Sequence, residues 1–282
     1  MKLRRAVAAD SPPVAAVVRA VYDEFGFTWD EAGYHADLRD VEASYAAFFV
    51  AETNGRIVGT AGLTAAGSLE RLYVLSGSRG KGAGSALLRA VAEEARGRGH
   101  RRLDIWTDKR LDDAHQLYER FGAQRSGERL NDDPDRSAEW GYTLGLEGAC
   151  AVVFDAEGRV LVVRERSGSA RGRYGFPGGT LEDDETPAEG AVRETHEETG
   201  VTVEVERRIG SYGSDNGHVV HAFRCRLLAG TPELQPGGEL AEVGWFTPGE
   251  IPEPHTNALR YTLADAVAGR RDVELTGLPR EY

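Results

Sequence analysis

The segment from Thr186 to Gly200 constrains the fold of this chain strongly, because it carries its own signals for the start and end of a helix. Thr186 is a typical N-cap residue, Pro187 suits the first helical position, and Glu189 completes a capping box. Gly200 suits the left-handed residue that ends many helices. Together these signals predict a helix over residues 187–199.

Three glutamates of this predicted helix share one face. Glu194, Glu197 and Glu198 follow an i, i+3, i+4 pattern, and Arg193 lies one turn before Glu197. Carboxylates at this spacing repel one another unless a cation lies between them. Hard oxygen ligands select Mg²⁺ or Mn²⁺, which can bridge phosphate oxygens. The pattern therefore predicts a divalent-metal site facing a diphosphate, whereas the alternative is merely a solvated acidic helix.

The run from Gly179 to Val201 resembles the Nudix box, G-x5-E-x7-R-E-U-x-E-E-x-G-U, with Glu185 as the first glutamate. Thr195 occupies a position where a bulkier aliphatic residue is commoner. The resemblance covers residues 148–282. It implies an α/β/α sandwich that hydrolyses a nucleoside diphosphate linked to another group.

The same resemblance implies the roles of individual residues in this half of the chain. It makes Glu194 and Glu198 the principal metal ligands, with Glu197 and the Gly178 carbonyl assisting. Glu197 and Glu239 are the catalytic candidates. Glu239 is expected to be a further ligand or a general base from a loop, and Glu242 is the alternative to it.

The nucleotide substrate is not identified by the sequence. Tyr174, Phe176 and Tyr212 are either stacking partners for a base or packing residues. A proline after the box would suggest ADP-ribose, but residues 211–218 contain none.

The first half of the chain contains a different device for a phosphate. A predicted strand over residues 69–75 runs into a glycine-rich turn and then into an amphipathic helix over residues 85–96. Glycines let main-chain amides turn toward an anion, and the helix N-terminus adds partial positive charge. The spacing fits neither a Walker loop nor a dinucleotide-binding loop.

The turn resembles motif A of GNAT-type N-acetyltransferases, R-x-x-G-x-G, and residues 114–122 resemble the A-x-x-L-Y-x-x-x-G segment of that family. Leu111, where Asn is frequent, and Ala123, where Phe is usual, depart from the pattern. The resemblance spans residues 2–146 and implies that acetyl-CoA is held by its pyrophosphate. Tyr118 would protonate the departing thiolate. The implied cofactor-binding residues are Leu72, Val74, Arg79, Gly80, Lys81, Gly82, Ala83 and Gly84.

An amine acceptor must lose a proton before it attacks the thioester. Glu70, on the strand before the glycine turn, is the candidate base, directly or through water. Trp29, Tyr34 and His35 lie where the family forms acceptor pockets, and each is either a specificity residue or a packing residue. Asp132, Asp133 and Asp135 form a loop that either attracts a cationic amine or is a solvated turn around Pro134.

The chain has 282 residues, which favours two domains, and we expect them at residues 1–146 and 148–282. The net charge of -12 argues against nucleic-acid binding. No apolar run is long enough to cross a membrane, and the N-terminus does not resemble a signal peptide. We therefore expect a cytoplasmic protein that acts on small molecules, and homodimerisation is left open.

Taken together, the sequence predicts an α/β protein with mixed sheets, in which a GNAT acetyltransferase fold precedes a Nudix sandwich. The function expected is acetyl-CoA-dependent N-acetylation of an amine and Mg²⁺-dependent hydrolysis of a nucleoside diphosphate derivative. In the main alternative, the first half senses acetyl-CoA or binds a partner and regulates the hydrolase. A third interpretation has the hydrolase act on CoA species.

Overall fold

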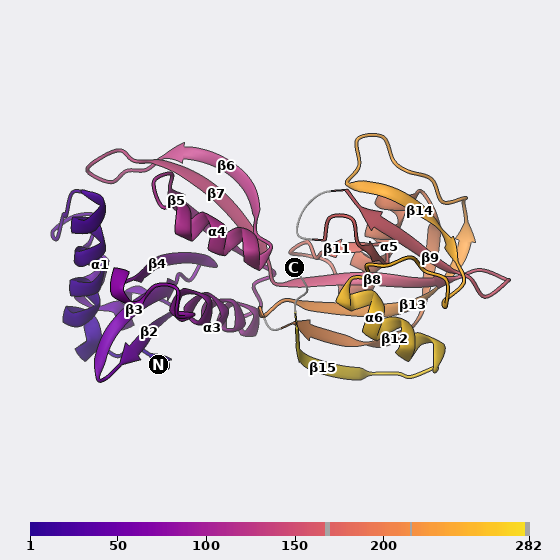
Figure 1. Cartoon of the computed structure of the whole chain (residues 1–282), viewed down its shortest axis with the longest axis horizontal. Coiled ribbons are helices and arrows are strands. Elements are labelled where there is room, and N and C mark those ends of the chain that lie inside the picture. Colours follow the sequence, from indigo (N-terminus) through magenta and orange to yellow (C-terminus); the bar gives the residue numbers. More distant parts are fainter. Residues whose placement is uncertain (167–169, 215, 280–282) are drawn as a thin grey trace. The chain divides into compact units, whose positions relative to one another are not determined.

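A computed structural model describes residues 1–166, 170–214 and 216–279 of the chain (Figure 1). The chain divides into two units, residues 1–144 and residues 145–282. We call them the N-terminal unit and the C-terminal unit, and describe each by itself.

The N-terminal unit is built on a seven-stranded mixed sheet with the strand order β1-β2-β3-β4-β5-β7-β6. Its strands are β1 (Lys2–Arg5), β2 (Ala47–Thr53), β3 (Arg56–Leu63), β4 (Ser68–Val74), β5 (Arg102–Asp108), β6 (Gln124–Leu130) and β7 (Ala138–Gly145). Its α-helices are α1 (Ser11–Phe25), α2 (Val41–Ser44), α3 (Ala83–Gly97) and α4 (Asp112–Phe121).

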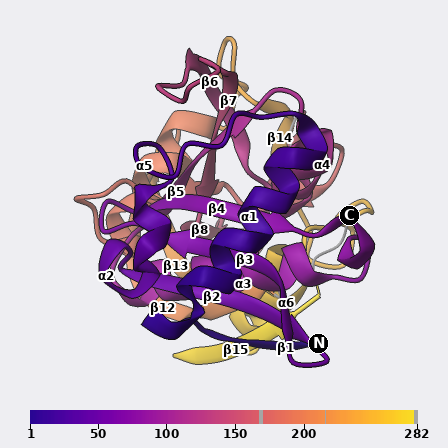
Figure 2. The same ribbon diagram turned by 90° about the vertical axis from the view of Figure 1, so that its left-hand side faces the viewer.

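Helices α1 and α3 cover opposite faces of this sheet (Figures 1 and 2). Each helix buries the apolar side of its sequence, with Val14 and Val18 in α1 and Leu87 and Val91 in α3 fully buried. The order Ser11-Pro12 predicts Ser11 as the N-cap of α1, and this prediction is wrong by one residue. Asp10 occupies the cap position, and the hydroxyl of Ser11 instead accepts a hydrogen bond from the amide of Val41 at 3.1 Å.

Two turns position the strands that later line the sites. The pair Asn54-Gly55 predicts a hairpin turn between two β-runs, and the left-handed φ values of the two residues, 52° and 73°, in the turn between β2 and β3 confirm it. Strand β4 pairs with the parallel strand β5 at Ser68 and Leu69. Beyond these pairs Arg71 has a φ of 54°, a left-handed value in the middle of a strand, and the register between β3 and β4 shifts there.

The C-terminal unit is built on an eight-stranded mixed sheet. Strands β10-β9-β8-β13-β12-β15 lie in that order, while β11 pairs with β8 and β14 pairs with β9. The strands are β8 (Glu147–Phe154), β9 (Val160–Glu165), β10 (Tyr174–Gly175), β11 (Gly178–Thr180), β12 (Thr202–Ser214), β13 (Val219–Ala229), β14 (Leu240–Phe246) and β15 (Val273–Leu278), and the helices are α5 (Pro187–Thr199) and α6 (Asn257–Val267).

Strand β8 separates two cores. Alternate residues of the strand point to opposite faces, as strand geometry requires. Ala149, Ala151 and Val153 pack in the core beneath α5, and Cys150 and Val152 pack in the core beneath α6. The sheet is therefore covered on both faces, which gives the expected sandwich. No helix among the described residues is long and apolar enough to span a membrane.

The helix punctuation predicted for α5 is confirmed. The Thr186 amide donates to the Glu189 carboxylate at 2.8 Å, and the Glu189 amide donates to the Thr186 hydroxyl at 3.3 Å. Gly200 ends the helix with a φ of 72°. The first turn of α5 therefore depends on one side-chain cap.

Replacing Thr186 with alanine should lower the stability of α5 by about 1 kcal/mol, because the helix loses a side-chain cap. Native-state hydrogen exchange of the amides in residues 186–200 measures this opening free energy directly. Thr231→Ala, at an exposed position outside any helix, is the control. Equal protection in Thr186→Ala and Thr231→Ala would show that the cap contributes nothing.

Candidate functional sites

Arg193 lies at the centre of the charged face of α5. Its guanidinium group donates to Glu194 at 2.9 Å, to Glu197 at 3.1 Å and to Glu185 at 2.6 and 2.9 Å. The expected pairing with Glu197 is thus confirmed. The side chain of Glu197 is 58% exposed, against 16% for Glu194 and 12% for Glu185. Glu197 is therefore the glutamate of this group that solvent and ligands reach most easily.

Glu198 takes a different partner from its two neighbours. Its carboxylate accepts a hydrogen bond from the amide of Gly178 at 2.9 Å. Burial raises the pKa of Glu198 to about 8, and the charges of Glu165, Glu194 and Glu239 add to the increase, although the Gly178 hydrogen bond opposes it. Bringing a cation to this carboxylate would relieve the repulsion among these acidic groups.

Glu165 and Glu239 lie close enough to act on one another. Burial, with the nearby charge of Glu239, raises the pKa of Glu165 to about 7. Glu242 is engaged elsewhere, since its carboxylate accepts from Arg164 at 3.1 Å and from the Tyr174 hydroxyl at 2.9 Å. Of these two candidates, Glu239, directly before β14, is thus the one whose charge acts on Glu198, whereas Glu242 lies within the strand.

The backbone of residues 178–179 lies directly against this acidic group. A Cβ atom on Gly179 would lie 2.4 Å from a carboxylate oxygen of Glu194, and one on Gly178 would lie 2.2 Å from the carbonyl oxygen of Ala149. Only glycine fits at these two positions. The main chain can therefore approach a ligand that lies between β11 and α5.

The donor set of this face suits a hard divalent cation. Glu194, Glu197 and Glu198 would supply carboxylate oxygens, which Mg²⁺ and Mn²⁺ prefer. In the described part of the chain, no three histidine, cysteine, aspartate or glutamate side chains already converge into a complete metal-binding group. Two of the three predicted ligands are instead held by Arg193 and the third by Gly178.

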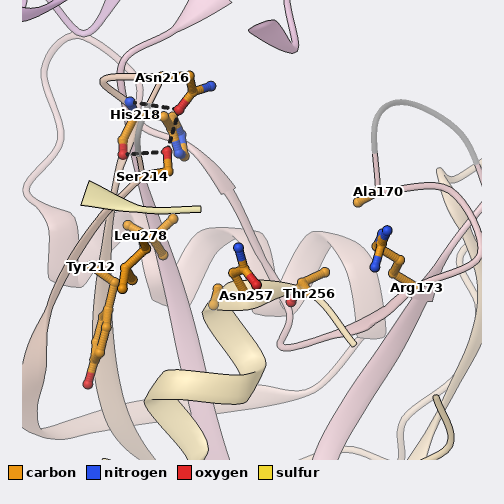
Figure 3. Close-up of a pocket in the computed structure, with 11 residues that line it drawn as sticks. Ala170, Arg173, Tyr212, Ser214, Asn216, His218, Thr256, Asn257 and Leu278 are labelled. Carbon is orange, nitrogen blue, oxygen red and sulfur yellow. Dashed lines mark hydrogen bonds between the residues drawn. The ribbon is translucent and has the colours of Figure 1, made fainter. Parts of the chain in front are cut away.

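A cavity of about 250 Å³ opens in the C-terminal unit between the ends of β12 and β13 and the start of α6 (Figure 3). Arg173, His218 and Asn257 bring polar groups to its wall. His218 lies beside Gly148, because a Cβ atom on Gly148 would be 3.4 Å from the imidazole and 2.7 Å from the Gly179 carbonyl oxygen. These contacts link the cavity wall to the glycine pair beside Glu194.

The three aromatic residues considered for base stacking are all buried. Tyr174 and Phe176 belong to the core beneath α6 and are 9% and 6% exposed. Tyr212 lines the cavity, but its hydroxyl donates to the buried carboxylate of Asp265 at 2.8 Å. Packing therefore accounts for Tyr174 and Phe176, and only Tyr212 can contribute an edge to a ligand in the cavity.

The glycine turn of the N-terminal unit borders a cavity of about 660 Å³, which we call the cradle cavity. Gly80 and Gly82 have left-handed φ values of 70° and 83°, and α3 begins directly after them at Ala83. The walls of the cradle cavity include all but one of the predicted cofactor-binding residues. These wall residues are Leu72, Val74, Arg79, Gly80, Gly82, Ala83 and Gly84.

The two basic side chains of the turn are already engaged. Arg79 binds the carboxylate of Glu24 through two hydrogen bonds of 2.6 and 2.8 Å, and its Nε donates to the Val74 carbonyl at 2.9 Å. Lys81 is the predicted residue that does not line the cavity, and its ammonium donates to the Gly77 carbonyl at 2.7 Å. The cradle therefore offers main-chain amides and a helix N-terminus rather than a free cation.

A second cavity of the N-terminal unit, of about 270 Å³, adjoins the cradle cavity and shares Leu72, Tyr73 and Leu111 with it. We call it the acceptor cavity. It contains both Tyr118 and Glu70, which the sequence places far apart. Burial raises the pKa of Tyr118, with Tyr73 and Tyr142 adding to the effect, so its hydroxyl remains protonated.

The residues proposed around the acceptor are placed differently from one another. Tyr34 lines the acceptor cavity, whereas the rings of Trp29 and His35 stack on each other at 4.1 Å. Asp133 also lines the cavity. Asp135 instead accepts hydrogen bonds from the amide and hydroxyl of Thr28.

Sequence reasoning missed two charged residues at these sites. Glu165 ends the apolar strand β9, and only the fold shows that it acts on Glu198. Arg71 lines the acceptor cavity with a side chain that is 8% exposed, and it binds the Asp37 carboxylate. The sequence does show that Arg71 is a charged residue inside a β-run. It does not show its partner, because Asp37 lies on another element.

Comparison with known proteins agrees with both resemblances. A family model described as the NUDIX domain matches residues 146–266, and one described as the Acetyltransferase (GNAT) family matches residues 14–123. A MutT-like protein of Streptomyces ambofaciens is 38% identical over 119 residues, covering 42% of this chain and 74% of that protein.

Two further relatives match one half each. An ADP-ribose pyrophosphatase of Methanocaldococcus jannaschii is 31% identical over 119 residues, covering 40% of this chain and 69% of that protein. The uncharacterized N-acetyltransferase YjgM of Escherichia coli is 35% identical over 133 residues, covering 43% of this chain and 80% of that protein. The chain therefore belongs to both families, as an enzyme in which a GNAT acetyltransferase domain is followed by a Nudix hydrolase domain.

Proposed function

We propose that residues 1–146 transfer an acetyl group from acetyl-CoA to an amine, and that residues 148–282 hydrolyse a nucleoside diphosphate derivative with Mg²⁺ or Mn²⁺. The observation that carries the first activity is the presence of Tyr118 and Glu70 in one cavity beside the cradle. The second rests on the acidic group around Glu198.

In acetyl transfer, Glu70 accepts a proton from the ammonium group of the acceptor, directly or through water. The amine nitrogen then bonds to the thioester carbonyl carbon, and the carbon–sulfur bond breaks. The departing thiolate takes the proton of Tyr118, and the Tyr118 oxygen takes the second proton that the nitrogen loses, so that the amide, the CoA thiol and neutral tyrosine result. The amides of residues 80–84 and the start of α3 hold the pyrophosphate of the cofactor.

In hydrolysis, Glu194, Glu197 and Glu198 would hold the cation, with the Gly178 carbonyl assisting, and the cation would neutralise phosphate charge and polarise the attacked phosphorus. Glu239 accepts a proton of the attacking water. The water oxygen bonds to one phosphorus, and the bond from that phosphorus to the bridging oxygen breaks. The cavity beside Asn257 and Arg173 accommodates the nucleoside part. Because one relative is named an ADP-ribose pyrophosphatase, ADP-ribose is the first substrate to test.

The regulatory alternative assigns acetyl-CoA binding without transfer to the first domain. Calorimetry with acetyl-CoA, together with a screen of amines, separates the two. Turnover of any amine supports the transferase, and binding without turnover that alters hydrolase kinetics supports the sensor. A nucleotide-diphosphate panel that includes CoA tests the remaining interpretation.

Glu198→Gln should lower the rate of Mg²⁺-dependent hydrolysis at least about 100-fold, because the cation loses one of its charged ligands. The neighbouring carboxylates remain and still repel one another. Initial rates of phosphate-bond cleavage on the nucleotide panel measure this. Asp184→Asn, an exposed acidic residue in the loop before α5, is the matched control. Retained activity in Glu198→Gln would remove the residue from the metal site.

Tyr118→Phe should lower kcat for acetyl transfer by about 100-fold, the range expected when a general acid is lost. Affinity for acetyl-CoA, measured by calorimetry, should stay the same and so serves as the folding control. Nudix hydrolysis by the same preparation should also be unaffected. An unchanged kcat would exclude Tyr118 as the acid.

Gly82→Ala should weaken acetyl-CoA binding by about ten-fold. A side chain in the left-handed region costs roughly 1–2 kcal/mol, and relief of that strain turns the amides of the cradle away from the phosphate. Gly77→Ala is the control, since Gly77 is not left-handed and a Cβ there meets no atom within 4 Å. Equal affinities for the two variants would contradict the cradle assignment.

A further inference from the structure

The positive side chains around the acceptor cavity are each neutralised by a carboxylate of their own. Arg71 donates twice to Asp37, at 2.9 and 3.0 Å. Arg129 donates to Glu139 at 2.8 Å. Arg110, beside the cavity, donates twice to Asp108, at 2.7 and 2.9 Å. Each of these three arginines is therefore paired with a carboxylate of the protein. None of the three offers an unpaired positive charge to an anionic acceptor.

Two carboxylates that line the same cavity have no such partner. Glu70 accepts a hydrogen bond from the Tyr45 hydroxyl at 3.3 Å, and Asp133 accepts one from the Ser137 amide at 2.8 Å. Both donors are neutral. Within residues 1–144, all of which the structure describes, neither carboxylate forms an ion pair with lysine, arginine or histidine. The cavity therefore presents two carboxylates that form no ion pair.

Aromatic residues also line the cavity, and their carbon surface suits a hydrocarbon chain. Arginine side chains already lie over the rings of Phe27, Tyr34 and Trp106. The aromatic residues of the wall are Tyr22, Phe27, Tyr34, Tyr73, Trp106 and Tyr118.

We propose that the acetyl acceptor is a small aliphatic amine that carries a second positive charge. The reacting nitrogen lies near Glu70, and Asp133 binds the second cation. This inference rests on the proposed acetyltransferase function and adds the charge and class of its acceptor. It also assigns Asp133 as the residue that distinguishes diamines from monoamines.

The loop itself provides a matched control for Asp133. Asp132 is its exposed neighbour and does not line the cavity. Removing the charge of Asp132 changes the net charge of the protein equally but leaves the cavity intact. A difference between the two variants therefore reports a local contact and not the overall field.

The experiment compares diaminobutane, butylamine and aminobutyrate as acceptors for the full chain with acetyl-CoA at near-neutral pH. We expect kcat/KM for diaminobutane to exceed that for butylamine by about ten-fold, the worth of one charge-assisted hydrogen bond. Aminobutyrate, with a negative far end, should be the poorest. The preference for the diamine should shrink as ionic strength rises.

Asp133→Asn should raise KM for diaminobutane by about ten-fold while leaving its kcat and both constants for butylamine unchanged. Asp132→Asn should change neither substrate's kinetics. Acetylation of butylamine and diaminobutane with equal kcat/KM would overturn the inference while leaving the transferase function standing. Equal effects of the two variants would overturn the role of Asp133.

Binding in the presence of CoA provides a measurement that does not need turnover. Calorimetry should show that diaminobutane binds the wild-type chain about ten-fold more tightly than butylamine, and that Asp133→Asn removes the difference. If this preference appears but no amine is acetylated, the cavity binds diamines as ligands and the transferase function fails. If no preference appears, the inference is overturned whatever the turnover.

Discussion

The guanidinium group of Arg193 donates to three carboxylates, those of Glu185 before α5 and of Glu194 and Glu197 in the second half of the helix. These carboxylates would otherwise repel one another, so the single guanidinium group stabilises the acidic face of α5. It also divides the glutamates into two groups. Glu194 and Glu197 face Arg193, while Glu198 faces the glycine loop and the second acidic group formed by Glu165 and Glu239. Metal binding and helix stability are thus linked through the same side chains.

Much of this organisation could be predicted, because local signals determine it. The cap at Thr186, the left-handed residue at Gly200 and the hairpin at Asn54–Gly55 depend on neighbouring residues, and all three are confirmed. The N-cap of α1 could not be placed correctly, because the hydroxyl of Ser11 is taken by the amide of Val41. That contact is tertiary. Arg71 and Glu165 were missed for the same reason, since their partners lie on distant elements.

The two domains handle negative charge in opposite ways. The Nudix domain gathers Glu165 and Glu198, whose pKa values are raised by burial and by neighbouring carboxylates, and a cation there would relieve the repulsion. In the GNAT domain the arginine of the glycine turn, Arg79, is paired with the carboxylate of Glu24, so that the cradle offers a ligand main-chain amides and a helix terminus. The net charge of the chain does not distinguish these two arrangements of charged residues, because both belong to one acidic chain.

The pairing of Arg71 with Asp37 has an evolutionary consequence. A buried arginine already lies in the wall of the acceptor cavity, and a single carboxylate conceals its charge from the substrate. A substitution of Asp37 by a neutral residue would expose that charge without changing Tyr118, and it would leave the Tyr45 hydroxyl, which contacts both Asp37 and Glu70, to Glu70 alone. One substitution behind the wall could therefore shift the cavity toward anionic acceptors.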